Sequence, residues 1–167
     1  GGGMNTLIVW DLTTGNPRHT LHHPSGSDSI NSLAISPDGR FLVSGGSNLV
    51  SVLWDLKTGE QMNTLQFSSY VKSVSYSRNG STIAIGGDRV GIVFFDGRTG
   101  ETLGTSDDVT SVDAVTFIPG GKMVAVGKSS RSGTIKTVSF WDTATGKMKR
   151  DFWGIPKLRG YSHPDAQ

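Results

Sequence analysis

The sequence predicts an all-β protein made of about three and a half copies of one four-stranded unit. Three observations predict it. An aromatic residue followed by Asp-x-x-Thr-Gly occurs four times along the 167 residues. A Pro-Asp-Gly type of turn and a pair of glycines recur with a step of 41 residues. The segments between these landmarks are short, apolar and rich in β-branched residues, which is typical of strands.

The first landmark predicts a tight hairpin turn. Its Asp side chain can accept hydrogen bonds from the backbone two residues on, and its Gly supplies the positive φ that closes the turn. The copies are 44, 41 and 46 residues apart. We expect the aromatic residues to pack at the ends of equivalent strands and the acids to begin equivalent turns. These structural residues are Trp10, Asp11, Trp54, Asp55, Phe95, Asp96, Trp141 and Asp142.

The other two landmarks divide each unit into four strands. Ser36-Pro37-Asp38-Gly39 has its counterpart 41 residues later, and Gly45-Gly46 is followed by Gly86-Gly87. The strands are apolar on both faces, so each sheet must be covered on both sides, as in sheets stacked around an axis. The expected strands are 30–36, 40–45, 50–55 and 60–66; 71–77, 81–86, 91–96 and 101–105; and 112–118, 122–127, 134–142 and 147–152.

With these landmarks in place, the segments 52–55 (Val-Leu-Trp-Asp) and 139–142 (Ser-Phe-Trp-Asp) resemble WD repeats. The resemblance extends over residues 1 to about 153 and rests on the period of about 41 residues. It implies a WD-repeat β-propeller whose strands a to d run outward from the axis. Residues 1–153 are then a partial propeller, with strands c and d of one repeat before three complete repeats, and residues 154–167 are an irregular tail. We expect the chain to be a fragment of a larger propeller.

The sequence also departs from the family pattern. Many WD repeats carry Gly-His between strands d and a, and that His joins a buried hydrogen-bond network with an Asp of the b–c turn. No repeat here carries Gly-His, and His22-His23 is the nearest equivalent. We therefore expect the buried network to be absent and the blades to rely on apolar packing.

Composition narrows the class of protein. Charged residues make up 18% of the chain and the formal net charge is +2, too small to require a nucleic-acid or membrane partner. The chain contains no Cys, which excludes disulfides and thiolate metal sites. No apolar run approaches the ~18 residues of a membrane span, and no secretory signal is visible. We expect an intracellular, cytoplasmic protein.

Candidate chemical groups favour structural interpretations. His19, His22, His23 and Asp28 could ligate a metal, but a solvated linker explains them better. We expect no cofactor, no metal and no hydrolytic activity. Two alternatives stay open: a metal-dependent lactonase or hydrolase built on a propeller, and a nucleic-acid-associated scaffold. The second would use the basic residues near the C-terminal end, Lys147, Lys149, Arg150, Lys157 and Arg159.

The resemblance implies a non-enzymatic scaffold that binds other proteins. In propellers the d–a and b–c connections gather at one end of the axis, where aromatic and Arg side chains can carry binding energy. The expected partner-binding residues are His22, His23, Asn48, Phe67, Tyr70, Arg89, Arg131 and Trp153.

We also expect the two ends of the blade stack to be open. Leu7 and Val9 should line one end face, and Phe140 and Phe152 the other. Large exposed apolar patches are uncommon on stable monomers. We therefore expect further blades, another copy of the chain or a partner protein to cover these faces, and no compact monomer of the isolated chain.

Overall fold

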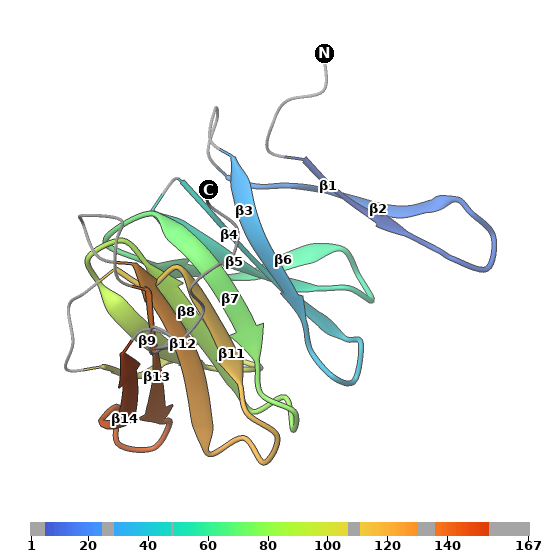
Figure 1. Ribbon diagram of the computed structural model, residues 1–167. Helices are drawn as coiled ribbons and strands as arrows, with labels where there is room; N and C mark the ends of the chain where they lie inside the picture. The colour runs from blue at the N-terminus through green and yellow to red at the C-terminus, as the bar shows by residue number, and fades with distance from the viewer. Residues whose placement is uncertain (1–5, 25–28, 48, 107–110, 130–135, 154–167) are drawn as a thin grey trace, which may run out of the picture.

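The computed structural model describes residues 6–24, 29–47, 49–106, 111–129 and 136–153. Every regular element in these ranges is a β-strand. No helix of the described chain has the length and hydropathy needed to cross a membrane. The strands form four antiparallel sheets that follow one another along the chain (Figure 1).

The first sheet has two strands and the three others, blades I to III, have four each. The first sheet consists of β1 (Thr6–Trp10) and β2 (Pro17–His22). Blade I consists of β3 (Ile30–Ile35), β4 (Phe41–Gly46), β5 (Val50–Asp55) and β6 (Glu60–Gln66). Blade II consists of β7 (Val71–Tyr76), β8 (Thr82–Gly87), β9 (Gly91–Asp96) and β10 (Thr102–Thr105). Blade III consists of β11 (Ala114–Phe117), β12 (Met123–Ser129), β13 (Lys136–Asp142) and β14 (Met148–Trp153).

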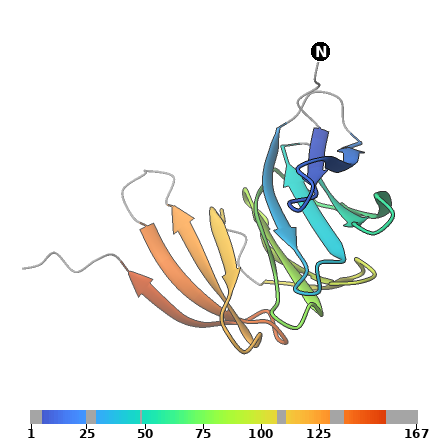
Figure 2. The ribbon, with the colours of Figure 1, turned by 90° about the vertical axis from the view of Figure 1, so that its right-hand side faces the viewer.

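This arrangement confirms the predicted partial propeller. Within each blade the strand order follows the chain, from the inner strand a to the outer strand d. The inner strands β3, β7 and β11 lie side by side, with β7 in contact with both of the others (Figures 1 and 2). The twelve strands of the blades begin and end within two residues of the bounds predicted from the sequence.

The c–d turns show why Asp-x-x-Thr-Gly recurs. In the turn after β9, Asp96 accepts backbone hydrogen bonds from Arg98 and Thr99, each 2.8 Å, and the N–H of Gly100 closes the turn on the Asp96 carbonyl at 3.0 Å. Glycine is required at position 100 for two reasons. Its φ is +73°, and a Cβ at this position would lie 2.7 Å from Leu65 Cδ2 of the neighbouring blade. Asp11, Asp55 and Asp142 begin turns of the same kind.

Three apolar cores hold the sheets together, one at each interface. Leu7 and Leu21 of the first sheet pack with Leu42 and Trp54 of blade I. The core between blades I and II contains Phe41, Val43, Leu53, Leu65, Phe67, Val71, Val74, Ile83, Ile85, Val93 and Phe95. The core between blades II and III contains Ala84, Ile92, Phe94, Val112, Val115, Val124, Val126 and Trp141. Blades I and II are thus apolar on both faces, as the sequence predicted.

Serine side chains join the inner strands of neighbouring blades. The N–H of Val74 in β7 donates to Ser32 Oγ in β3 at 3.1 Å. The same bond recurs one blade later, where the N–H of Val115 donates to Ser73 Oγ at 3.1 Å. Strand a is the inner edge of each blade, so these hydroxyls satisfy backbone donors that no further strand of the blade reaches.

The first sheet differs from the prediction in the direction of its side chains. Leu7 and Val9 face blade I and belong to its interface core, so the expectation that they line an open end was wrong. The opposite face carries Ile8 and Trp10, which are 48% and 53% exposed. Trp10 therefore does not pack like Trp54, although both end a strand c, because no described sheet covers the outer face of β1. The side chain of Phe152 lies outside the described residues.

Candidate functional site

One rim of the blade stack brings together the d–a connections and the b–c turns. The N–H of Ser47, in the b–c turn of blade I, donates to the carbonyl of Ser29 at 3.0 Å. The N–H of Asp88, in the b–c turn of blade II, donates to the carbonyl of Tyr70 at 3.1 Å. These bonds fix the two kinds of connection next to each other, and we call the surface they form the upper rim.

The upper rim exposes large side chains beside these hydrogen-bonded connections. Tyr70 is 55% exposed, and the Arg89 side chain is 72% exposed. Leu49 and Arg89 hold φ at 65° and 60°, a left-handed conformation that is costly for residues other than Gly, Asn and Asp. Strained residues of this kind concentrate at functional sites. The feature marks these two b–c turns as candidate contact points.

A chain of charged groups lies beside these residues. Lys72 Nζ, at the start of β7, is 2.9 Å from Asp113 Oδ1 and 3.8 Å from Asp88 Oδ1. Arg89 Nε is 3.7 Å from Asp88 Oδ2, and Ser111 Oγ donates to Asp88. The pairs are partly exposed, so solvent screens them and each contributes little to stability. They nevertheless hold both signs of charge in fixed places between blades II and III.

Lys72 and Asp113 occupy the same repeat position as Asn31, one blade apart. Asn31 Nδ2 donates to the carbonyl of Val71 at 2.9 Å, so it also reaches the following blade. The three positions carry an amide, an amine and a carboxylate. The structure adds that their side chains bridge neighbouring blades at the rim.

The predicted partner-binding residues divide into exposed and buried ones. His22, Tyr70 and Arg89 are exposed. His23 and Phe67 are buried, so their prediction as contact residues was wrong: both turn into the stack behind the ends of β2 and β6. Asn48 and Arg131 lie outside the described residues, as does the side chain of Trp153 at the end of β14.

Leu49 was missed by the sequence analysis. It is 45% exposed and carries positive φ, but the four residues from Ser47 to Val50 contain no Gly to signal a left-handed position. Its place became visible only with the backbone of the b–c turn.

The first interface holds a buried polar set, although the b–c turn of blade I contains no Asp that could complete the family's His–Asp network. Trp54 Nε1 donates to Ser44 Oγ at 2.9 Å, and both residues are buried. His23 lies against Ser44 and is 6% exposed. Burial lowers the pKa of His23, and a hydrogen bond with the Ser44 backbone opposes that effect. The side chain of His23 is thus buried at this interface although His22, and not Gly, precedes it.

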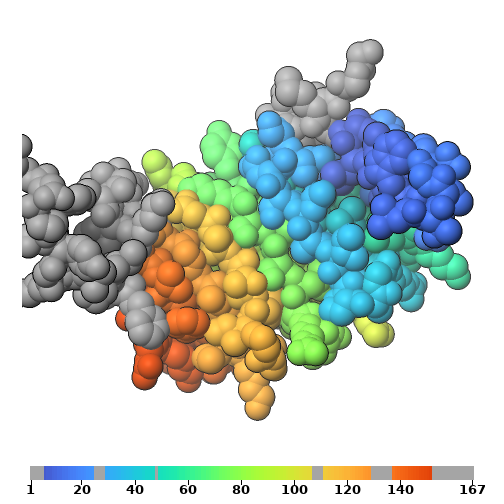
Figure 3. Space-filling view, turned by 45° about the vertical axis from the view of Figure 1, so that its right-hand side comes forward, coloured from blue at the N-terminus to red at the C-terminus, as the bar shows by residue number. Residues whose placement is uncertain are grey.

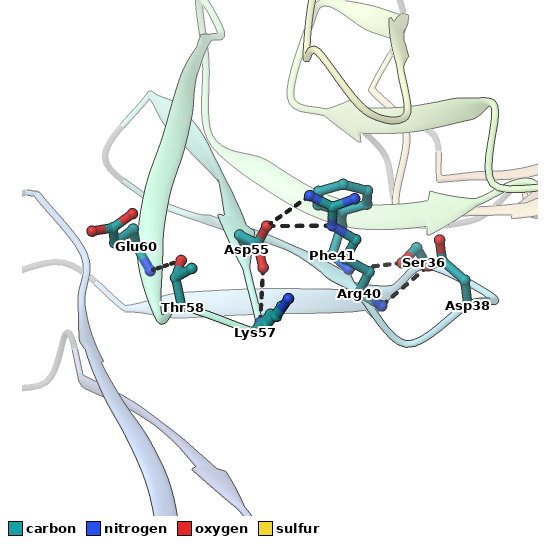
Figure 4. Close-up of polar contacts among 8 residues, drawn as sticks. All are labelled: Ser36, Asp38, Arg40, Phe41, Asp55, Lys57, Thr58 and Glu60. Atoms are coloured by element: carbon teal, nitrogen blue, oxygen red, sulfur yellow. Dashed lines mark hydrogen bonds and ion pairs between the residues drawn. The ribbon is translucent and has the colours of Figure 1, made fainter.

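The opposite rim holds the a–b and c–d turns, and its polar side chains serve the turns themselves (Figure 4). Asp55 accepts the backbone N–H of Lys57 at 2.8 Å and the Arg40 side chain at 3.3 Å. The N–H of Phe41 donates to Ser36 Oγ at 2.8 Å. The backbone hydrogen bond from Lys57 holds the pKa of Asp55 below its ordinary value. The acids that begin the c–d turns on this rim are therefore turn residues rather than candidate acid–base groups. They are Asp11, Asp55, Asp96 and Asp142.

The described residues also bear on the alternative functions. No three His, Cys, Asp or Glu side chains within the described ranges lie close enough together to hold a metal ion. In the basic cluster, Lys149 Nζ lies 3.6 Å from Asp142 Oδ2 of the neighbouring turn. Asp28, Lys157 and Arg159 lie outside the described residues.

Comparison with known proteins agrees with this architecture. Residues 15–55 match the family described as WD domain, G-beta repeat. Small ribosomal subunit protein RACK1 of Caenorhabditis elegans is 35% identical over 75 residues, covering 45% of this chain and 22% of that protein. Cross-pathway control WD-repeat protein 2 of Flammulina velutipes is 31% identical over 75 residues, covering 45% of this chain and 23% of that protein. The matches thus span less than a quarter of these relatives.

A solved structure extends the likeness to most of the fold. Kuenenia stuttgartiensis hydrazine synthase superposes with a TM-score of 0.78 at 16% identity, over 89% of this chain and 43% of that chain. Identity at this level shows the shared fold alone. Together with the 41-residue period and the four-stranded blades, these matches show that residues 15–55 are similar to a WD repeat and that the described chain has the fold of a partial β-propeller.

Proposed function

We propose that this chain is a non-enzymatic scaffold module that binds other proteins through its upper rim. The observation that carries the proposal is the exposed pair Tyr70 and Arg89, fixed beside the Lys72–Asp88–Asp113 charges. Tyr and Arg are the residue types that most often supply binding energy at protein interfaces. The similarity to WD-repeat proteins, including RACK1, supports a scaffold role.

The charges suit a protein partner in two ways. Fixed charges of both signs select a partner with the complementary arrangement and disfavour others. A highly basic surface, which a nucleic acid would require, is not what these residues form, because two acids offset Lys72 and Arg89. The absence of Cys from the chain fits an intracellular location, where thiols stay reduced.

A site-specific cross-linking experiment tests the proposal. A photoreactive amino acid placed at Tyr70 or Arg89 should yield a defined protein adduct in cells, while the same group at Lys57 on the opposite rim should not. The adduct identifies the partner, which is then purified. Tyr70→Ala/Arg89→Ala should weaken its binding at least tenfold, which corresponds to about 1.4 kcal/mol.

Lys57→Ala is the matched control and should bind normally. Equal cross-linking from both rims, or an unchanged affinity of the double variant, would show that the upper rim is not the contact surface.

A further inference from the structure

We propose that Asn79 is a site of spontaneous deamidation, in which the backbone nitrogen of Gly80 attacks the Asn79 side chain and the turn keeps its structure around the aspartate that forms. Both residues lie in the a–b turn of blade II, between β7 and β8. This turn is on the rim opposite Tyr70 and Arg89, so the modification does not depend on the partner surface proposed above.

The reaction needs an Asn, the backbone nitrogen that follows it, and water. The Gly80 nitrogen gives its proton to solvent and forms a bond to Asn79 Cγ. The bond from Cγ to Nδ2 then breaks, and the leaving nitrogen takes up a proton and departs as ammonia. Water opens the resulting five-membered imide at one of its two carbonyls, which gives either aspartate or isoaspartate. A following Gly favours ring closure because it has no Cβ to obstruct the attack.

The turn that holds these atoms is open to solvent. Asn79 is exposed and Gly80 is half-buried. In Figure 3 the a–b turn of blade II, in green, projects at the lower edge of the molecule. The Gly80 N–H donates to the Ser77 carbonyl at 2.9 Å, and this bond must open before the nitrogen can attack. A single turn bond at an exposed hairpin tip opens at a low cost in free energy.

The Asn79 side chain is held over the peptide that attacks it. Its Oδ1 accepts the N–H of Ser81, two residues on, at 3.1 Å, and the hydroxyls of Ser77 and Ser81, each at 2.8 Å. The bond from the Ser81 N–H folds the side chain back along the chain, toward the Gly80 nitrogen. The three donors also draw electron density from Cγ and stabilise the oxygen on which negative charge develops during the attack.

Blade I shows that the same turn accommodates an aspartate. Asp38 occupies the position of Asn79 one repeat earlier, and its Oδ1 accepts the Ser36 hydroxyl and, at 3.1 Å, the N–H of Arg40 (Figure 4). The hydrogen bond from Ser36 holds the pKa of Asp38 below its ordinary value. Among the described residues, the hydrogen bonds of the Asn79 side chain all use Oδ1. Replacing its amide nitrogen with oxygen therefore leaves each of these bonds in place.

The other Asn residues that the structure describes lack this combination. The amide nitrogens of Asn31 and Asn63 donate to backbone carbonyls of the next blade, each at 2.9 Å, and conversion to aspartate would remove that donor. Both residues lie in strands, where pairing holds the chain extended. Asn16 precedes Pro17, whose nitrogen carries no proton and cannot close the ring in this way. Within these ranges, deamidation of the folded chain should therefore concentrate at Asn79.

Peptide mapping by mass spectrometry tests this expectation. The 167-residue chain is incubated in its folded state at mildly alkaline pH and then digested. The peptide that contains Asn79 should gain the mass of an amide replaced by an acid, while the peptides that contain Asn31 and Asn63 stay unchanged. Labelling with isoaspartyl methyltransferase should detect isoaspartate beside aspartate at position 79, because the imide opens in two ways. The rate should increase with pH, since the attacking nitrogen must lose its proton.

Gly80→Ala tests the attacking residue. It should slow the reaction by about tenfold or more, because the added Cβ obstructs ring closure. A Cβ at this position would lie 3.5 Å from its nearest neighbour, Pro37 Cδ, so the variant has room to fold. Gly80 has a φ of +71°, so Ala also loosens the turn, which by itself would speed the reaction. A slower rate in this variant therefore identifies the Gly80 nitrogen as the attacking group.

Asn79→Asp reproduces the aspartate product, and Asn63→Asp is the matched control. Asn79→Asp should unfold at the urea midpoint of the native chain. Asn63→Asp should unfold at a lower midpoint, because its bond to the Thr99 carbonyl would be replaced by two facing oxygens.

Three results would overturn the proposal: an Asn79 that reacts no faster than Asn31 and Asn63, an unchanged rate in Gly80→Ala, or a loss of stability in Asn79→Asp as large as in Asn63→Asp. Tyr70→Ala/Arg89→Ala should deamidate at the native rate, so failure of the rim proposal and failure of this one can be told apart.

Discussion

The interface between the first sheet and blade I and the interface between blades I and II differ in the side chains at three equivalent buried positions. At the first, three equivalent positions hold Trp54, Ser44 and His23, with a hydrogen bond of 2.9 Å from Trp54 to Ser44. At the second, the same positions hold Phe95, Ile85 and Phe67. All six residues are buried.

The difference shows that the buried polar set is not needed to join two sheets of this fold. At these three positions the interface between blades I and II uses apolar side chains alone. A satisfied polar network restricts the core to one arrangement, but it becomes costly once a member is lost, because a buried group is then left without a partner. The first interface should therefore respond to changes of chemistry, and the second mainly to changes of volume.

The largest expected effect is removal of the ring at either interface. Trp54→Ala and Phe95→Ala should each lower the free energy of unfolding by about 3–5 kcal/mol, as large-to-small core changes do. Urea denaturation followed by circular dichroism measures both. The first interface should also be destabilised by Trp54→Phe. This variant keeps an aromatic ring but removes the donor to Ser44, and the buried hydroxyl left behind should cost about 1–3 kcal/mol.

A double variant isolates the hydrogen bond. Adding Ser44→Ala to Trp54→Phe should restore part of the lost stability, since it removes the unsatisfied hydroxyl. If both variants unfold at the midpoint of the native chain, the hydrogen bond contributes nothing and the two interfaces are energetically alike.

The second prediction separates a turn from the interface that it contacts. Gly15 and Gly100 close equivalent c–d turns with φ of +70° and +73°. A Cβ at Gly100 would lie 2.7 Å from the buried Leu65, whereas no described atom lies within 4 Å of a Cβ at Gly15. Gly15→Ala should cost about 1 kcal/mol for backbone strain. Gly100→Ala should cost about 1–3 kcal/mol more, because the blade I–II core must also give way. Equal losses in thermal unfolding would show that the neighbouring blade yields freely.

The repeat made the fold predictable from the sequence. Asp-x-x-Thr-Gly and the paired glycines act within their own hairpins, so local turn chemistry determines where each strand begins and ends. Strand positions were therefore predicted to within two residues. The Asp11, Asp55, Asp96 and Asp142 turns needed no information from distant parts of the chain.

The candidate site was less predictable, because it depends on which way a side chain turns between sheets. Alternation along a strand predicts two faces but not which neighbour each face meets, so Leu7 and Val9 were assigned to the wrong side. His23 and Phe67 lie just beyond strand ends, where the periodicity stops. The shift of Leu49 to positive φ has no sequence signal at all. Connections between sheets carry the site, and local patterns do not define them.

The smallest expected effect is a dependence of stability on pH that belongs to the first interface alone. Burial lowers the pKa of His23 from its ordinary value near 6.5. Below pH 6.5 the unfolded chain therefore binds a proton that the folded chain resists, so stability decreases as the pH falls from 6.5 toward the pKa of the folded state. His23→Phe introduces the residue that occupies the same position at the blade I–II interface, and it should remove this decrease between pH 7.5 and 5.5.

The turn carboxylates do not interfere in this window, because backbone hydrogen bonds hold the pKa values of Asp11, Asp96 and Asp142 below 3.8. His22→Phe, at an exposed neighbouring position, should leave the decrease in place. Urea midpoints measured across the range decide the matter: parallel curves for the native chain and His23→Phe would mean that His23 is as easily protonated in the folded state as in the unfolded one.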